Sequence, residues 1–239
     1  MARKQTTTTK FEIIQVAGEL FLEVGYSNTS PKMIAKELGL STGNITYYFP
    51  TKEHLLKEIV EMLCDFQWKL LEYEADRGYG SAASICLELM TVASACAENE
   101  IARDFFVSAF QSEMCRNFLR ENHVARAKRI FADRCGDWDH ERYEQAEILV
   151  MGLQYATVVT TDATVSLPAR ISGALHQILS IYNVEEETRI QEIQKVLAMD
   201  CRALGGRVMA EFRKFVNCAS EKALERMVFR RKNGREELQ

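Results

Sequence analysis

The spacing of apolar residues between positions 30 and 53 predicts two short helices joined by a tight turn, with a third helix directly after them. The apolar stripe of the first helix consists of Met33, Ile34 and Leu38. Ser30 suits the N-cap, and Pro31 suits the first helical position because no N–H is needed there. Gly39 favours the left-handed conformation that ends a helix, and Ser41 can cap the next one. The short turn matches that of a helix-turn-helix.

The second short helix, at residues 42–49, carries an unusual outward face. With Ile45 pointing inward, Tyr48 and Phe49 fall on the same side at about 100° per residue. The opposite face holds no charged residue and consists of Gly43, Asn44, Thr46 and Tyr47. A bare backbone, an amide, a hydroxyl and a phenol suit contacts with phosphates and base edges. The pattern is therefore typical of a helix that reads DNA.

The rest of the chain shows helical periodicity and no alternating strand pattern, which predicts an all-α protein. We expect the first ten residues, MARKQTTTTK, to be a flexible arm before a helix at about 9–24. A long helix should run from Thr51 to about Asp76. Further helices are predicted at 81–98, 101–119, 121–135, 139–165, 169–182, 185–204 and 207–230, the last two separated by a break at Gly205-Gly206.

Several short segments between Phe11 and Leu56 carry a resemblance to a known family. They are FLEVGY at 21–26, TS at 29–30, IAKELGLS at 34–41, Gly43, Tyr47, Phe49, KE at 52–53 and LL at 55–56. With this spacing, the run resembles the DNA-binding domain of the TetR family of transcriptional regulators. The resemblance implies a three-helix DNA-binding domain at 1–51 and a larger helical domain for ligand binding and dimerisation at 52–239.

The resemblance also implies which residues meet DNA. Thr29, Tyr47 and Lys52 should contact phosphates, and the residues nearest the bases should be Thr42, Gly43 and Asn44. Thr46 stands where the family usually has an aromatic residue, so the phosphate contact at that position departs from the family pattern. The alternative is that Tyr47 packs on a neighbouring helix and that Lys52 is an ordinary solvated lysine.

Apolar residues in the larger domain suggest one wall of a ligand pocket. Phe106, Phe110, Met114 and Phe118 recur every four residues, a pattern that is also common in an ordinary core. In the resembling family the pocket lies between the helices that follow the fourth one. The residues expected to line it here are Phe66, Phe106, Phe110, Met114, Met151 and Tyr155.

Residues 148–161 carry no charge and form the most apolar run in the chain. Their 14 residues are fewer than the roughly 20 that a membrane span needs. TetR-family members dimerise through a four-helix bundle made from two late helices of each subunit, and this segment with 169–182 fits that role, with Gly152 and Gly173 allowing close packing. The alternative is burial within one subunit, under the helices that follow Asn183.

Charge and cysteine content limit the other functions. Residues 1–57 hold seven Lys or Arg against five Asp or Glu, whereas the remainder is acidic, so strong DNA binding would need two basic heads on one duplex. Seven cysteines form no CxxC pair and no zinc-site spacing, which indicates reduced thiols in a cytoplasmic protein. We therefore expect no metal or cofactor. The N-terminus lacks the apolar stretch of a signal peptide.

None of the four histidines lies in a catalytic motif, and the cluster of Asp139, His140, Glu141 and Glu144 suits a solvated first helical turn. Together with the resemblance to the TetR family, this implies a non-enzymatic homodimeric repressor that binds a palindromic DNA operator. An apolar or aromatic small molecule should release it. An activator or a ligand-blind regulator is the first alternative. A helical enzyme or thiol sensor with a vestigial DNA-binding head is the second.

Overall fold

The computed structural model describes residues 2–76, 81–161 and 164–218, and the secondary structure of these residues is helical throughout, which confirms the all-α prediction. The helices are α1 (Ala2–Glu23), α2 (Pro31–Glu37), α3 (Thr42–Tyr48), α4 (Lys52–Asp76), α5 (Ser81–Glu98), α6 (Glu100–Gln111), α7 (Glu113–Ile130), α8 (His140–Val159), α9 (Leu167–Ile181), α10 (Glu186–Leu197) and α11 (Cys201–Cys218). Of these helices, none is both long and apolar enough to cross a membrane.

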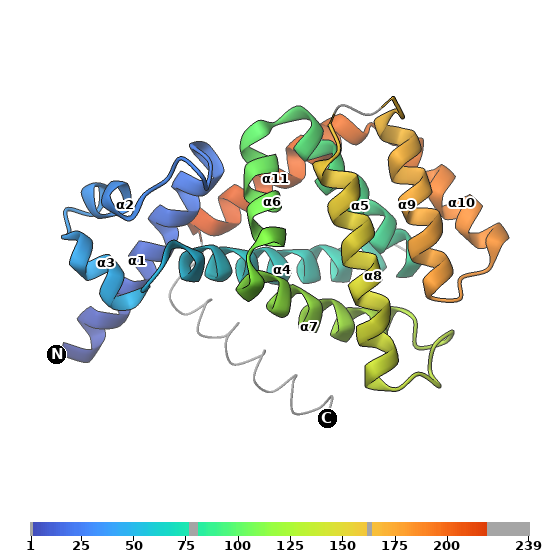
Figure 1. Ribbon diagram of the computed structural model, residues 1–239, viewed down its shortest axis with the longest axis horizontal. Helices are drawn as coiled ribbons and strands as arrows, with labels where there is room; N and C mark the ends of the chain where they lie inside the picture. The colour runs from blue at the N-terminus through green and yellow to red at the C-terminus, as the bar shows by residue number, and fades with distance from the viewer. Residues whose placement is uncertain (1, 77–80, 162–163, 219–239) are drawn as a thin grey trace.

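Helices α1–α3 form a head at one end of the molecule, and α5–α11 form the body (Figure 1). The two short helices of the head have the predicted caps. The Ser30 side chain accepts a hydrogen bond from the Met33 amide, and Ser41 does the same for the Asn44 amide. Gly39 lies between the two helices at φ +64°, the left-handed region that favours glycine.

Helix α4 runs lengthwise from the head into the body (Figure 1). Leu55, Leu56 and Ile59 of α4 are fully buried and belong to one continuous apolar cluster. The cluster joins core residues of the head to core residues of α6 and α11, and among its members are Phe21, Ile34, Ile45, Phe105 and Phe212. The head and the body therefore share a core through α4.

A second apolar cluster fills the far part of the body. It holds residues of α5 and α7–α10, among them Leu89, Val124, Val150, Leu175 and Ile193. Tyr182 directly after α9 is also fully buried, and its ring stacks on Phe131 at a centroid distance of 4.2 Å. A small cavity lies where this cluster approaches the first one.

Several predicted helix boundaries were wrong. The expected helix at 101–119 ends at Gln111, because Ser112 leaves the helical conformation and its side chain caps α7. Residues 131–135 form turns, and α8 ends at Val159. The expected flexible arm is also wrong, because α1 begins at Ala2. The expected residues 219–230 of the last helix lie outside the described residues.

Gly205-Gly206 was predicted to break a helix, but both residues lie inside α11. A Cβ at Gly205 would come within 3.0 Å of the Ala95 amide nitrogen and of the Thr91 carbonyl oxygen on α5. A Cβ at Gly206 would meet nothing within 4 Å. Gly205 therefore permits a close approach of two helices, and the chain bends earlier, between Leu197 and Cys201.

The two glycines give a matched test of this helix contact. Gly205→Ala should lower the free energy of unfolding by about 1–3 kcal/mol relative to Gly206→Ala, because only the first added methyl group presses on a neighbouring backbone. Both substitutions bring the same gain in helix propensity. Urea unfolding followed by circular dichroism measures the difference, and equal stabilities would contradict the close approach.

Candidate nucleic-acid interface and internal cavity

The outward face of α3 is exposed. Ile45 is 1% exposed and anchors the helix, whereas Tyr47 is 79% exposed. The other residues of the face are also exposed: Thr42, Gly43, Asn44 and Thr46. Tyr47 therefore does not pack into a neighbouring helix. Its ring makes an edge-to-face contact with the ring of Tyr48 in the same helix, with the two centroids 5.0 Å apart. Helix α3 presents small and polar groups to a partner.

The chain itself does not require a glycine on this face. A Cβ at Gly43 would have the Ser41 hydroxyl as its nearest neighbour, at an ordinary contact distance of 3.6 Å. The Thr46 hydroxyl lies within hydrogen-bond distance of the Thr42 and Gly43 carbonyl oxygens, at 3.4 and 3.3 Å. Thr46 therefore bonds its own helix, whereas Tyr47 has its hydroxyl at the end of an exposed ring.

Thr29 and Lys52 act within the head. Thr29 is buried, and its hydroxyl donates a hydrogen bond to the Gly25 carbonyl oxygen at 2.7 Å. The Lys52 ammonium group donates to the Tyr26 and Thr29 carbonyl oxygens at 2.8 and 3.0 Å and lies 4.1 Å from the centroid of the Tyr26 ring. Burial lowers the pKa of Lys52. Both residues hold the loop between α1 and α2 in place.

Asp104, on α6, ties this same loop to the body. Its carboxylate accepts hydrogen bonds from the Ser27 amide at 2.8 Å and from the Ser27 hydroxyl. A Cβ at Gly25, where φ is +99°, would come within 3.0 Å of the same carboxylate. Sequence reasoning missed Asp104, because one acidic residue in a helix carries no signal of a partner 77 positions away.

Helix α11 makes a second connection between the head and the body. Val216 packs so close to α1 that a Cβ at Gly18 would meet its side chain at 2.6 Å. Arg213 pairs with Glu23 at the end of α1. At the body side, the Phe212 ring lies 5.6 Å from the Phe66 ring of α4. Ile59 of α4 would lie 3.0 Å from the same Cβ at Gly18, so this glycine permits a close approach of α1 to both α11 and α4.

A small internal cavity lies among α4–α8 and has a volume of about 40 Å³. Most of its wall is apolar, and the lining residues are Val60, Leu63, Gln67, Glu88, Leu89, Val92, Phe106, Ala109, Phe110, Leu119, His123, Gln154 and Val158. The volume suffices for only a few water molecules, since one needs roughly 10–15 Å³. A larger molecule would have to move the surrounding helices apart.

Two of the six predicted pocket residues, Phe106 and Phe110, line this cavity. Phe66 instead packs against the aromatic rings of α11. Met114, Met151 and Tyr155 are not among the lining residues. The centroid of the Tyr155 ring lies 5.8 Å from that of Phe110, which does line the cavity. The polar members of the wall were not predicted.

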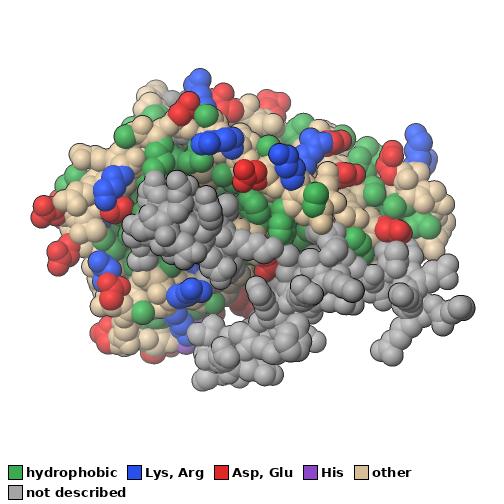
Figure 2. Space-filling view, turned by 180° about the vertical axis from the view of Figure 1, so that it is seen from behind, with side chains coloured by type: hydrophobic (Ala, Val, Ile, Leu, Met, Phe, Trp, Pro, Cys, Tyr) green, Lys and Arg blue, Asp and Glu red, His purple; other side chains and the backbone are tan. Residues whose placement is uncertain are grey.

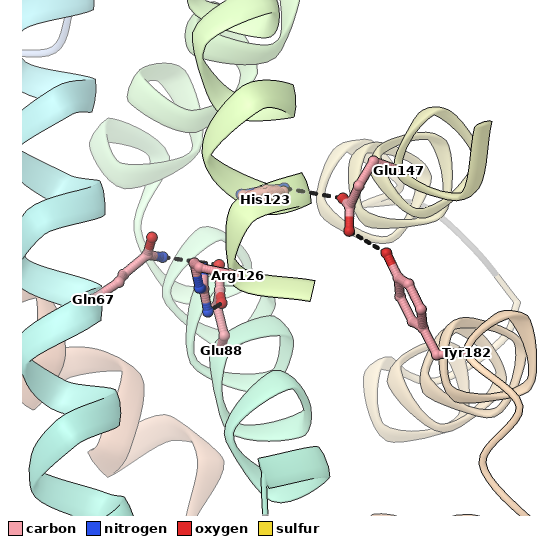
Figure 3. A network of polar contacts seen from close by, with 6 residues as sticks. All are labelled: Gln67, Glu88, His123, Arg126, Glu147 and Tyr182. Atoms are coloured by element: carbon pink, nitrogen blue, oxygen red, sulfur yellow. Dashed lines mark hydrogen bonds and ion pairs between the residues drawn. The ribbon is translucent and has the colours of Figure 1, made fainter. Parts of the chain in front are cut away.

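Gln67, Glu88 and His123 belong to a buried polar network, whose other members are Arg126, Glu147 and Tyr182 (Figure 3). Arg126 of α7 pairs with Glu88 of α5, and Gln67 of α4 donates to the other oxygen of Glu88 at 3.0 Å. Glu147 of α8 accepts a hydrogen bond from the Tyr182 hydroxyl. Burial would raise the pKa of Glu88, but Arg126 beside it holds the pKa below its usual value. Glu88 therefore stays charged inside the body.

An apolar face of α8 is left uncovered by the described residues. Ile148 and Leu149 are 58% and 60% exposed, and Val159 is 39% exposed. Gly152 lies between them, and Gly173 is exposed on neighbouring α9; a Cβ at either would meet nothing within 4 Å. The described helices after Asn183 do not cover this face, in contrast to the single-subunit alternative.

Of the cysteines whose side chains the structure describes, only Cys218 is exposed. No group of three or more His, Cys, Asp or Glu residues in the described part of the chain could hold a metal ion. Five of the cysteines are buried, and burial raises the pKa of the Cys86 and Cys96 thiols to about 12.

On the face shown in Figure 2, basic and acidic described side chains are interspersed.

Comparison with known proteins places the strongest similarity in the head. Residues 13–59 match a model described as bacterial regulatory proteins of the tetR family. The HTH-type transcriptional regulator QacR of Staphylococcus aureus is 43% identical over 63 residues, which are 25% of this chain and 34% of QacR. The uncharacterised HTH-type transcriptional regulator YuxN of Bacillus subtilis is 43% identical over 53 residues, or 22% of this chain and 18% of YuxN.

The matched stretch thus spans about a third or less of these relatives' own length. Among solved structures, a crystal structure of a gamma-butyrolactone receptor (ArpA-like protein) matches with a TM-score of 0.44 and 18% identity. That alignment covers 87% of this chain and 98% of the receptor chain.

The contact between Asp104 and the head gives a testable prediction. Asp104→Ala should speed hydrogen exchange of the Ser27 amide by about tenfold, because the loop loses two hydrogen bonds to a charged group. Hydrogen exchange followed by mass spectrometry or NMR measures this rate. Glu100→Ala, which removes an exposed carboxylate from the same helix, should leave it unchanged. An equal effect of both variants would contradict the tie.

Proposed function

Because the chain belongs to the TetR family of bacterial regulatory proteins, we propose that it is a transcriptional regulator that binds a palindromic DNA operator as a homodimer. The observation that carries this proposal is the outward face of α3, which is exposed, uncharged and polar while Ile45 holds the helix in the head. The regulator acts in the cytoplasm as a repressor, and a small molecule that enters the body releases it from DNA.

Within the proposed interface, Tyr47 and Thr46 lie along the phosphate backbone, and the bases are nearest to Thr42, Gly43 and Asn44. Thr29 and Lys52 complete the proposed contacts at the start of α2 and α4. Lys52 has three ammonium donors and uses two within the loop, which leaves one for a phosphate. Thr29 would reach phosphate through backbone groups, because its hydroxyl already bonds Gly25.

If residues 1–51 bind DNA and residues 52–239 bind the effector, the effector site must be coupled to the DNA-binding head. Helix α4 lines the cavity with Val60 and Leu63, and it begins at Lys52 in the head. Helix α6 lines it with Phe106, two residues after Asp104, which holds the loop of the head. A molecule that widens the cavity would therefore move the two helices that position α3, which supports release by an effector.

The proposed dimer pairs the exposed faces of α8 and α9 with those of a second copy. Ile148 and Leu149 would be buried there, and Gly152 and Gly173 would let the helices approach closely. A dimer is also what the DNA requires, since paired recognition helices bind half-sites about 34–36 Å apart or further. The largely apolar cavity wall supports an effector with an apolar or aromatic part.

Activation is the alternative direction of regulation, and it depends on where the operator lies relative to the promoter. Burial disfavours Cys86 and Cys96 as sensing thiols, since a reactive cysteine needs an accessible thiol of lowered pKa and the pKa of these two is raised. Cys218 is the exposed cysteine among the described residues. The similarity of the head to transcriptional regulators likewise favours regulation over enzymatic activity.

The DNA-binding proposal is tested by selecting duplexes from a random pool and measuring affinity by gel shift. We expect a palindromic sequence, and Tyr47→Phe should weaken its binding about tenfold or more, because each subunit loses a phosphate contact. Stability should stay within about 0.5 kcal/mol, since Tyr47 is 79% exposed. Lys195→Gln, at an exposed position far along the chain in α10, is the control. Failure to enrich any sequence would refute the proposal.

The dimer interface is tested by light scattering after size-exclusion chromatography. Leu149→Glu should convert the protein to a monomer, because it places a charge in the proposed apolar contact. The matched control is Ile190→Glu, which makes a similar change at an apolar residue of α10 that is 42% exposed. A dimer that persists in both variants would place the interface elsewhere.

A further inference from the structure

The internal cavity has a smaller neighbour. A second cavity of about 20 Å³ lies among α5 and α7–α9. Glu88, His123 and Gln154 line both cavities, so the two are separated by a shared polar wall. One side of this wall is mainly apolar and the other holds the buried network, which gives the combined space an apolar and a polar end.

One half of the network consists of Glu88, Arg126 and Gln67, and its charges are balanced. Arg126 supplies the opposite charge, and Gln67 donates to the second carboxylate oxygen (Figure 3). An effector with a negative charge would have to compete with Glu88 for Arg126 in the buried interior. Separating a buried ion pair is strongly unfavourable, so this half is a poor site for an anion.

The Glu147 half is left short of donors. One carboxylate oxygen of Glu147 accepts a hydrogen bond from Tyr182, but the other accepts none and has the His123 Nδ1 at 3.4 Å. The side-chain oxygen of Gln154 is also buried and accepts no hydrogen bond. Glu147 is 3% exposed, so it is almost entirely removed from bulk water. Leaving such an acceptor without a donor is unfavourable by about 1–3 kcal/mol.

Three features thus coincide at one place: a cavity wall, a deeply buried carboxylate oxygen without a donor, and an amide oxygen without a donor. Resting on the proposed function, we propose that the effector is an amphipathic molecule with an apolar body and a hydrogen-bond-donating end, an amine or a hydroxyl group. Its apolar body occupies the cavity beside Phe106 and Phe110, and its donor reaches Gln154 and Glu147.

A donor end adds a polar requirement to the apolar or aromatic character proposed for the effector. A carboxylate at the polar end would place a second negative charge beside Glu147 with no free cation to receive it, which is repulsive in a buried site. A purely apolar molecule would leave both acceptors without donors. Binding of a donor end would instead satisfy them, and α8, the helix that carries both acceptors, also lines the cavity.

The test uses three probes of equal chain length, n-octylamine, n-octanol and n-octanoate, and measures their binding to the full-length protein by isothermal titration calorimetry. We expect octylamine and octanol to bind, and octanoate to bind at least about tenfold more weakly than either. Octylamine binding tighter than octanol would assign the donor to a cation, and the reverse order would assign it to a neutral hydroxyl. Equal binding of all three, a preference for octanoate or no binding at all would overturn the proposal.

Variants locate the site within the body. Gln154→Leu removes one acceptor and should reduce the preference for octylamine and octanol over octanoate at least about threefold. Glu147→Gln should do the same. Glu141→Gln removes an exposed carboxylate of the same helix and should leave the preference unchanged. Because Glu147→Gln alters a buried network and could prevent folding, Gln154→Leu by itself decides the outcome. An unchanged preference in Gln154→Leu would overturn the assignment.

The two proposals fail in different ways. Selection of an operator from random DNA without any probe tests regulation, and calorimetry without DNA tests the polar end of the cavity. A protein that selects DNA but binds the three probes equally would keep its proposed function and lose this inference. A protein that prefers donor-ended probes but selects no DNA would do the opposite.

Discussion

The packing of α4 connects the head to the cavity, because two adjacent residues of this helix contact one each. The position of the head relative to the body depends on this packing. Ile59 lies against Gly18 of α1, whereas Val60 lines the internal cavity. Both side chains are fully buried in a single apolar cluster that extends into the head and the body. Because protein interiors are close-packed, even a small displacement of α4 changes the packing both in the head and around the cavity.

Two further contacts keep the head from turning freely about α4. Asp104 on α6 receives two hydrogen bonds from Ser27, and Val216 on α11 packs against Gly18. These contacts come from opposite ends of the body sequence, and each involves an element that also belongs to the body's core. The orientation of α3 is therefore set by three elements, and an effector that moves any of them changes how the head is held.

The polar network gives the interior of the body a defined chemistry. Buried charges contribute little net stability, because desolvation offsets much of the attraction between them. Their geometry nevertheless restricts what the cavity can accept, since each donor and acceptor must find a partner. With Glu88 matched by Arg126 and Glu147 short of a donor, the interior favours molecules that donate hydrogen bonds over molecules that accept them.

The local parts of this protein could be predicted from the sequence, because their causes lie within a few residues. Caps at Ser30 and Ser41, the left-handed Gly39 and the inward Ile45 follow from short-range hydrogen bonding and helical periodicity. The outward face of α3 follows from the same periodicity. The break at Ser112 was missed, because an apolar stripe continued through it.

Only the tertiary structure decided the rest, because it depends on residues far apart in the chain. Gly205 marks a close contact with α5 rather than a break, and a single glycine does not distinguish the two. Asp104 and Glu147 carry no sign in sequence of the groups that they meet, Ser27 and Tyr182. Periodicity tells which face of a helix is buried, but packing alone determines what that face touches.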